Sequence, residues 1–379
     1  MLDFYKGKRV FITGHTGFKG SWLAKILAMA GAKVYGYSLA PDDGDNLYDI
    51  SHVDEQICSH IGDIRNFEEL KSFFDTAAPE IVFHLAAQPI VRESYRNPRY
   101  TYETNVMGTV NICECVRLSD TVRSFVNVTT DKVYENNDLE HSFLEDEKLD
   151  GFDPYSNSKS CSELVTHAYI NSFFTDKEIA VSTARAGNVI GGGDFAKDRI
   201  VPDLVRAAIN GSEMVLRNPE AVRPFQHVLE ALSAYLLLAE KQYEDSSFAG
   251  FYNVGPDDND AVTAERLANM FADSWNELME NDAESMPVDS SNELMQKAAE
   301  NMHADCGSNR ALAISIKPDG GPHEAKYLRL DATKIRQKLS WKPEWNIETA
   351  MEKTVLWTYE YTKGNGKSAM EEQIMEYFS

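Results

Sequence analysis

The first half of the chain alternates short apolar runs with longer stretches in which apolar residues recur at helical spacing. The apolar runs, which predict buried strands, are 9–13, 33–37, 81–85, 124–129 and 181–184. The stretches with helical spacing are 21–29, 67–75, 99–118 and 155–174. Strands that alternate with helices are typical of a parallel sheet with helices on both faces, so the pattern predicts a doubly wound α/β fold.

The alternation of apolar runs and helical spacing ends at about residue 185, and beyond it glycines and prolines divide the chain into shorter predicted elements. We therefore expect a first unit over 1–184 and a smaller second unit over 185–223 and 257–379. A helix-like segment at 227–240 and a strand-like segment at 250–254 predict that 224–256 rejoins the first unit. The segment 277–309 is acidic and poor in large apolar residues, which predicts a solvated insertion.

Composition excludes several functional classes. The 379 residues include 43% hydrophobic residues, enough to fill a sizeable core, so global disorder is excluded. There are 37 Lys and Arg against 60 Asp and Glu, a formal net charge of −23. Such a field repels nucleic acid backbones, although a local basic cleft can still bind a small anion. We therefore expect no nucleic acid partner.

Cysteine spacing and apolar run length bear on compartment and membrane. The five cysteines form no CxxC pair and no metal-ligand spacing, and the N-terminus resembles no cleavable signal. No apolar run approaches the roughly 20 residues that a membrane helix needs. We expect a reduced, cytoplasmic protein with no metal site and no membrane span.

A glycine-rich turn follows the first predicted strand. Gly14, Gly17 and Gly20 are spaced three apart, directly between that strand and the first predicted helix. Glycine permits a tight turn and a close backbone approach, and the helix N-terminus offers unpaired N–H groups to a pyrophosphate. The motif predicts a dinucleotide ligand, whereas an ordinary glycine-rich turn is the alternative.

The choice between NAD and NADP stays open. A carboxylate at the end of the second strand usually binds the ribose hydroxyls of NAD. Here Asp42 and Asp43 lie a few residues too late, and Lys19 favours a phosphate. Asp63, after an apparent third strand, can accept a hydrogen bond from an adenine amino group or is simply an exposed loop aspartate.

Tyr155 and Lys159 begin a predicted helix at the spacing i, i+4, which places both on one face. A lysine charge near a tyrosine lowers the phenol pKa, so the tyrosine can remove a hydroxyl proton while a hydride leaves. The two positions alone are common on amphipathic helices. Combined with the glycine motif, they predict a dehydrogenase-type site.

Thr130, Asp131 and Lys132 follow the strand predicted at 124–129. In doubly wound folds, ligands bind outside the carboxyl ends of the strands, so these groups are placed to act on a substrate. A surface ion pair between Asp131 and Lys132 is the alternative.

These residues resemble those of the extended short-chain dehydrogenase/reductase superfamily, and more narrowly the chain is similar to the CDP-glucose 4,6-dehydratases. The similarity is carried by GHTGFKGSWL, HLAAQPIVRESYRNP, TNVMGTV, DPYSNSK, ARAGNVIGGGDFAKDRIVPDLVRA, RNPEAVRPFQHVLEALSAYLLLAE and HEAKYLRLDATK, which span nearly the whole chain. The resemblance implies a Rossmann domain with a smaller C-terminal nucleotide-sugar-binding domain.

The resemblance also implies a reaction: NAD-dependent loss of water from CDP-glucose to give CDP-4-keto-6-deoxyglucose. Tyr155, assisted by Lys159, would deprotonate the sugar 4-hydroxyl, and Thr130 would orient the 4-oxygen. Asp131 would protonate the leaving 6-hydroxyl. Related dehydratases carry glutamate, the base for the C5 proton, where this chain has Lys132, so the identity of that base stays open.

Further contacts follow from matched positions. The resemblance implies that the cofactor contacts Gly14, Thr16, Gly17, Phe18, Lys19, Gly20, Asp63, Ile64, Leu85, Ala86, Ala87, Tyr155 and Lys159. It implies that the substrate contacts Gln88, Asn188, Arg199, Arg217, Asn218 and Arg223. Guanidinium groups suit phosphate oxygens, although each arginine can equally pair with a surface carboxylate.

Three alternatives remain open. They are a 4,6-dehydratase for another nucleotide sugar, a 4-epimerase or reductase that does not need Asp131, and a non-catalytic nucleotide-binding regulator. The segment 135–141 reads ENNDLEH where the family leads us to expect aromatic residues, which bears on substrate preference. The apolar faces of 99–118 and 155–174 resemble a four-helix dimer interface, so we expect a homodimer, with a tetramer as the alternative.

Overall fold

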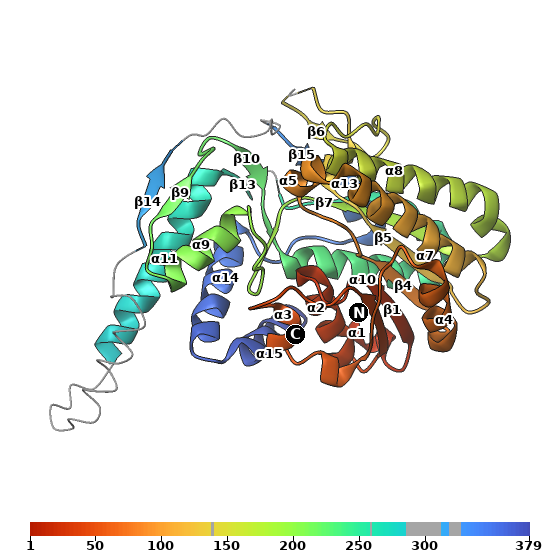
Figure 1. Ribbon diagram of the computed structural model, residues 1–379, viewed down its shortest axis with the longest axis horizontal. Helices are drawn as coiled ribbons and strands as arrows, with labels where there is room; N and C mark the ends of the chain where they lie inside the picture. The colour runs from red at the N-terminus through yellow and green to blue at the C-terminus, as the bar shows by residue number, and fades with distance from the viewer. Residues whose placement is uncertain (138–139, 258–259, 286–311, 318–326) are drawn as a thin grey trace.

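A seven-stranded parallel sheet forms the centre of the protein (Figure 1). The computed structural model describes residues 1–137, 140–257, 260–285, 312–317 and 327–379. The strand order is β12-β7-β5-β4-β1-β2-β3. The strands are β1 (Arg9–Thr13), β2 (Lys33–Ser38), β3 (Cys58–Ile61), β4 (Ile81–His84), β5 (Ser124–Val128), β7 (Ala180–Ala186) and β12 (Phe251–Val254). The predicted doubly wound parallel sheet is confirmed.

Side chains of each strand alternate between two helix layers. Val10 and Ile12 of β1 pack in one core with α2 (Phe18–Met29) and α10 (Val228–Glu244). Phe11 points to the other face and packs with α4 (Phe67–Ala77) and α7 (Gly108–Arg117). Because both faces are covered, the strands read as continuous apolar runs rather than alternating ones. The strand order reverses between β1 and β4, where doubly wound folds bind ligands.

Two predicted helices are longer composites. The segment predicted at 99–118 consists of α6 (Pro98–Tyr102), a π-helical turn (Glu103–Met107) and α7. The segment predicted at 155–174 consists of α8 (Pro154–Tyr169) and a π-helical turn (Ile170–Phe174). The edge strand β3 is mostly exposed and polar, so no apolar run announces it.

A second core lies beside the sheet and is built from α9 (Ile200–Ile209), α11 (Ala264–Ser285) and α14 (Ile347–Thr362). The acidic segment predicted at 277–309 begins within α11, and 286–309 lies outside the described residues. Two late helices, α13 (Thr333–Leu339) and α15 (Gly366–Tyr377), contribute side chains to the first core instead. The C-terminal segment therefore packs on both units.

Small elements complete the chain. The short helices are α1 (Leu2–Tyr5), α3 (Leu47–Ile50) and α5 (Val91–Arg96), with single turns at Asp54–Gln56, η3 (Asp131–Val133), Thr175–Lys177 and Ser246–Phe248. The short strands pair as β6 (Ser142–Phe143) with β15 (Arg329–Leu330), β8 (Val189–Ile190) with β11 (Gln226–His227), β9 (Met214–Leu216) with β14 (Ile314–Ile316), and β10 (Val222–Pro224) with β13 (Ala261–Thr263). Most lie beyond the carboxyl ends of the large sheet.

The glycine run after β8 packs tightly against side chains of the first core. A Cβ added at Gly192 would overlap the ring of Trp357, and Trp22 Nε1 donates to the Gly192 carbonyl at 3.1 Å. Gly193 has φ +85°, and a Cβ there would lie 2.5 Å from Leu47 Cδ1. The run therefore permits close packing of α2, α3 and α14 around one backbone segment.

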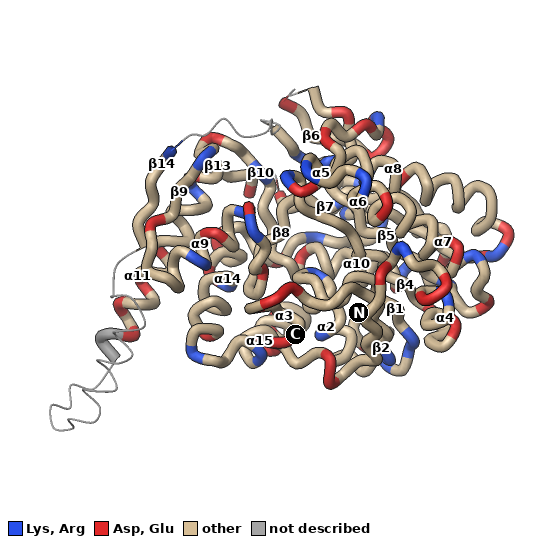
Figure 2. The backbone as a smooth tube through the Cα atoms, in the orientation of Figure 1, with Lys and Arg blue, Asp and Glu red and all other residues tan. Residues whose placement is uncertain are grey.

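The surface has mixed charge. Figure 2 shows acidic and basic residues interspersed along the backbone, although the net charge is −23. No helix in the described parts of the chain is both long and apolar enough to cross a membrane. Cys58, Cys113, Cys115 and Cys161 are free thiols, and Cys306 lies outside the described residues.

Candidate active site

The glycine turn forms a close-packed loop at the start of α2. Gly14 has φ +80°, and a Cβ there would lie 2.7 Å from Ala86 N. A Cβ at Gly20 would overlap the Gly14 carbonyl oxygen. Gly17, by contrast, would gain only an ordinary 3.5 Å contact, and it is the N-cap of α2 without a side-chain cap. Two glycines thus serve packing, and Gly17 leaves the first-turn N–H groups open to an anion.

The end of β2 is occupied by hydroxyl groups rather than by an acid. Thr16 Oγ1 shares a hydrogen bond of 2.8 Å with Ser38 Oγ and donates to the Leu39 carbonyl at 2.9 Å. Asp42 and Asp43 are exposed, or nearly so, in the following loop. Asp63 pairs with Arg65 at 2.6 Å, and hydrogen bonding from Arg65 lowers the pKa of Asp63.

The remaining predicted cofactor residues surround the ends of β1 and β4. The backbone N–H groups of Leu85 and Ala86 each lie 3.2 Å from Thr13 Oγ1. Ile64 is buried, and a Cβ at Gly108 would lie 2.9 Å from it. Leu85 and Ala86 therefore lie at the switch point of the sheet against the glycine turn, whereas Ile64 packs against α7.

The start of α8 is set by Asp153 and Pro154. The Asp153 carboxylate accepts hydrogen bonds from the backbone N–H groups of Tyr155 and Ser156, both at 3.0 Å, and proline occupies the first helical turn. Tyr155 and Lys159 are both buried, and Lys159 Nζ donates to the Val128 carbonyl at 3.2 Å. The helix thus places both residues beside the end of β5.

Burial dominates the protonation of this pair. It raises the pKa of Tyr155 to about 12, while the Thr130 hydroxyl and the Arg199 charge pull it down. Burial and the nearby Lys19 lower the pKa of Lys159 to about 8. We expected Lys159 to lower the phenol pKa; in the structure the largest contributions in that direction come from the Thr130 hydroxyl and from Arg199.

Asp131 is 2% exposed in η3, which excludes a surface ion pair with Lys132. Thr130 Oγ1 donates to Asp131 Oδ1 at 2.8 Å. Asp131 Oδ2 has no hydrogen-bond partner within the described residues. Burial raises the pKa of Asp131 although Lys132, Thr130, Arg223 and Lys19 oppose it. The carboxyl group is therefore held toward its protonated form.

The predicted phosphate ligands lie around the same end of the sheet. Arg223 is buried, and its electrostatic effect on Asp131 places it near the carboxyl group. Arg199 pairs with Asp194 at 3.2 Å and lies near Tyr155. Asn188 Nδ2 is buried without a hydrogen-bond partner in the described structure. Among the described residues of this group, the Asn188 amide therefore leaves a donor available.

Three other predicted substrate residues differ in their surroundings. Gln88 is buried, its amide donates to Thr101 Oγ1 at 2.9 Å, and its carbonyl accepts from Ile90 N at 2.6 Å. Both ends of that side chain therefore bond inside the protein. Arg217 is exposed and lies 3.7 Å from Asp198, and Asn218 is also exposed.

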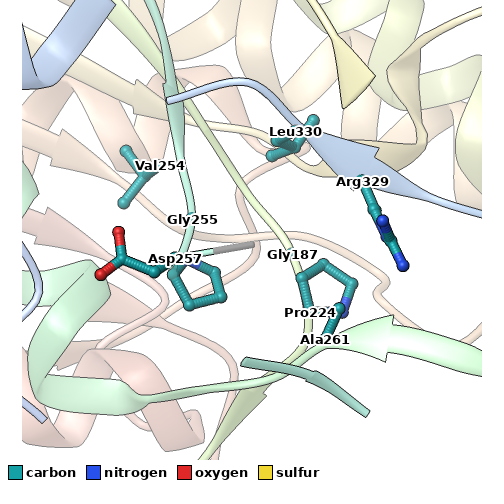
Figure 3. Close-up of a pocket in the computed structure, with 9 residues that line it drawn as sticks. Gly187, Pro224, Val254, Gly255, Asp257, Ala261, Arg329 and Leu330 are labelled. Atoms are coloured by element: carbon teal, nitrogen blue, oxygen red, sulfur yellow. The ribbon is translucent and has the colours of Figure 1, made fainter. Parts of the chain in front are cut away.

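A cavity opens beside Gly187 at the end of β7. It is a small hollow between β10, β12 and β15 (Figure 3). Its lining includes Pro224, Gly255, Asp257 and Arg329. Because a Cβ on Gly187 would lie 3.1 Å from Asp131 Oδ2, the cavity adjoins the Asp131 carboxyl group.

Sequence analysis missed a buried pair behind these residues. Glu163 and Arg185 are both fully buried and joined at 2.9 Å. Glu163 follows Lys159 by four residues, so extending the spacing of Tyr155 and Lys159 by one helical turn finds it. No group of His, Cys, Asp or Glu in the described ranges could hold a metal ion.

Comparison with known proteins identifies the family. The family model described as GDP-mannose 4,6 dehydratase matches residues 11–354. The CDP-glucose 4,6-dehydratase of Salmonella typhimurium is 41% identical over 96% of this chain and 94% of its own length. A probable dTDP-glucose 4,6-dehydratase of Sinorhizobium fredii is 26% identical over 93% of both chains.

Solved structures share the fold. The dTDP-glucose 4,6-dehydratase of Bacillus anthracis, in complex with NAD, superposes with a TM-score of 0.70 at 20% identity over 95% of this chain and 99% of that one. The UDP-glucose 4-epimerase of Thermotoga maritima, with UDP-glucose, gives a TM-score of 0.72 at 20% identity over 93% and 99%. The match of the family model and the 41% identical relative together establish that this chain belongs to the GDP-mannose 4,6-dehydratase family.

Proposed function

We propose that the protein dehydrates CDP-glucose to CDP-4-keto-6-deoxyglucose with NAD as its cofactor. The observation that carries the proposal is Asp131, a buried carboxyl group with a raised pKa beside Tyr155 and Lys159. An enzyme that only oxidises or epimerises C4 needs the tyrosine and the lysine, whereas elimination also needs an acid. The 41% identical relative named CDP-glucose 4,6-dehydratase supports the choice of substrate.

The glycine turn fits a dinucleotide. Gly14 and Gly20 permit packing that a Cβ would block, and Gly17 leaves the N-terminus of α2 uncapped. We assign the pyrophosphate to this N-terminus, and the nicotinamide end to the region of Leu85–Ala87, Tyr155 and Lys159. When bound, NAD would supply the hydride acceptor for oxidation at C4 and the hydride donor for reduction at C6. The positive charge of bound NAD would lower the pKa of Tyr155 and so favour the phenolate. Burial has the opposite effect, because it raises that pKa.

Oxidation at C4 begins at Tyr155. Its phenolate oxygen takes the proton of the 4-hydroxyl as the hydride leaves C4, which gives a 4-ketone. Lys159 stabilises the phenolate by its charge, and the Thr130 hydroxyl holds the sugar 4-oxygen. Thr130 suits this role because it already contacts both the Tyr155 phenol and the Asp131 carboxyl group.

Elimination follows because the ketone acidifies the C5 proton. Asp131 gives its proton to the 6-hydroxyl, which departs as water. Lys132, the next residue in η3, is the candidate base that takes the C5 proton and returns it when C6 is reduced. The overall change is the loss of one water without net oxidation.

Cationic groups around this end of the sheet would hold the diphosphate of the substrate. Arg199 and Arg223 are the first candidates because both lie near the reacting residues. The unpaired amide of Asn188 supplies a further donor. Arg217 and Asn218 are placed farther out, where they would meet the base or the ribose.

We further propose a cytoplasmic homodimer. Exposed apolar side chains lie on the predicted interface helices and their ends: Met107 is 50%, Leu118 47%, Leu164 52% and Phe173 44% exposed. Pairing of two copies would cover these side chains.

The test is turnover with a panel of nucleotide sugars. Purified protein is incubated with CDP-glucose, and separately with dTDP-, GDP- and UDP-hexoses, with NAD or NADP, and the alkaline absorbance of 4-keto-6-deoxy sugars is followed. Signal with CDP-glucose and NAD alone is expected. Signal with another nucleotide moves the substrate, and turnover without loss of water favours a 4-epimerase.

A further inference from the structure

A buried ion pair lies directly behind the catalytic residues. Glu163 of α8 and Arg185 of β7 are both 0% exposed. Arg185 Nε donates to Glu163 Oε1 at 3.0 Å and Nη2 donates to Oε2 at 2.9 Å, a bidentate arrangement. Burial of two charges is costly unless further hydrogen bonds satisfy the remaining atoms. Those further bonds lead to the active site.

Glu163 continues the row of catalytic side chains along α8. Tyr155, Lys159 and Glu163 are spaced four residues apart and so lie on one face of the helix. The negative charge of Glu163 opposes the burial and the Lys19 charge that lower the pKa of Lys159. Through Glu163, the pair therefore influences the protonation of Lys159 on α8.

The same pair holds both ends of the segment 129–134, which we call the catalytic turn. Before η3, Thr129 Oγ1 donates to Glu163 Oε1 at 2.5 Å. After it, Arg185 Nη1 donates to the Tyr134 hydroxyl oxygen at 2.8 Å. Tyr134 in turn donates to Asn253 Oδ1 of β12 at 2.6 Å. Thr130, Asp131 and Lys132 lie between these two fixed ends.

We propose that Glu163 and Arg185 are positioning residues that fix the catalytic turn relative to Tyr155 and Lys159. The turn carries the acid, and α8 carries the base that acts on the same sugar. This inference rests on the proposed function, because it requires both groups to serve one reaction. A displacement of about 1 Å between such groups can cost about 100-fold in rate.

Two threonines offer a matched test. Thr129 and Thr183 are both buried, and both donate to Glu163, Thr183 at 2.7 Å to Oε2. Thr129 belongs to the catalytic turn, whereas Thr183 lies within β7. Thr129→Val should lower kcat for CDP-glucose about tenfold or more with KM unchanged, because the turn loses its anchor. Thr183→Val should keep the wild-type kcat, although it should lower Tm about as much as Thr129→Val does.

The result that overturns the inference is equal kcat for T129V and T183V. Tyr134→Phe releases the other end of the turn, so it should reproduce the kcat loss of T129V with KM unchanged. A wild-type kcat for Y134F would also contradict the proposal that Glu163 and Arg185 position the catalytic turn. Absence of wild-type turnover with CDP-glucose would instead contradict the proposed function, and that is decided before either variant is compared.

Discussion

The carboxyl group of Asp131 lies against the backbone of Gly187, where an added Cβ would be 3.1 Å from Oδ2. The same oxygen has no hydrogen-bond partner among the described residues. Gly187, the residue after β7, thus carries no side chain at the point where the Asp131 carboxyl group adjoins the neighbouring cavity.

Replacement of the acid should separate elimination from oxidation. Asp131→Asn should lower dehydration by about 100-fold or more while NAD affinity stays unchanged. Absorbance of the reduced nicotinamide should then accumulate without release of water. Asp150→Asn is the control, since Asp150 is exposed and pairs with Lys148 at 3.0 Å. Dehydration by D131N at the wild-type rate would remove Asp131 from the mechanism.

The raised pKa of Asp131 also predicts a pH dependence. The acid must be protonated to assist loss of the hydroxyl, so kcat should fall as the pH rises through that pKa. The fall should be absent from the residual activity of D131N. A pH profile of kcat for the two proteins checks this, and an identical alkaline limb in both would count against the assignment.

Tyr155→Phe should abolish the oxidation itself, with a loss of about 100-fold or more. Because the phenolate is the active form, kcat should rise with pH through the phenol pKa. Lys159→Met should move that rise to higher pH, since it removes a positive charge that favours the phenolate. Tyr102→Phe is a matched control: Tyr102 donates to Asn157 of the same helix at 2.9 Å but lies outside the proposed chemistry.

Two glycines of the same turn should respond differently to alanine. Gly17→Ala should fold with an unchanged Tm and lose about tenfold in NAD affinity, or 1.4 kcal/mol, because the new methyl would stand at the N-terminus of α2, to which we assign the pyrophosphate. Gly20→Ala should lower Tm, because its Cβ overlaps the Gly14 carbonyl. Thermal unfolding and NAD titration separate the two effects. A stable G20A, or a G17A that binds NAD normally, would contradict the description of the turn.

Stability should depend on pH through Glu230. Burial raises the pKa of Glu230 from 4.5 to about 7, although bonds from Tyr377 and the N–H groups of Trp345 and Glu344 oppose the shift. The folded state therefore binds more protons than the unfolded state between these values, so stability falls as the pH rises through them. The free energy of unfolding should fall by about 3 kcal/mol across this pH range because of Glu230.

Glu230→Gln removes this dependence. Urea unfolding at about pH 5 and about pH 8 should show a smaller difference for E230Q than for the wild-type protein. Glu244→Gln is the control, because Glu244 lies at the exposed end of the same helix. An unchanged pH dependence in E230Q would show that other groups account for it.

Local patterns made much of the site predictable. The turn around Gly17 and the pair Tyr155 and Lys159 depend on short spacings within one loop or one helix, which the sequence displays directly. The alternation of strands and helices likewise predicts the sheet, because the central strands are buried on both faces. The polar edge strand β3 has no such pattern.

Contacts between distant segments were not predictable in this way. Arg185 of strand β7 reaches Glu163 of helix α8, and Trp357 packs on Gly192 from a helix near the C-terminus. The pKa of Tyr155 responds to Arg199, which a spacing within α8 cannot reveal. These relationships depend on tertiary packing that no single stretch of sequence encodes.

The central claim is that one site oxidises C4 and then reduces C6 of the same sugar. The most direct measurement uses CDP-glucose carrying deuterium at C4, with NAD and the wild-type protein, and locates the label in the product by NMR. The account predicts a 4-keto-6-deoxy sugar with deuterium at C6, transferred within one molecule. Deuterium retained at C4 or lost to solvent would contradict it.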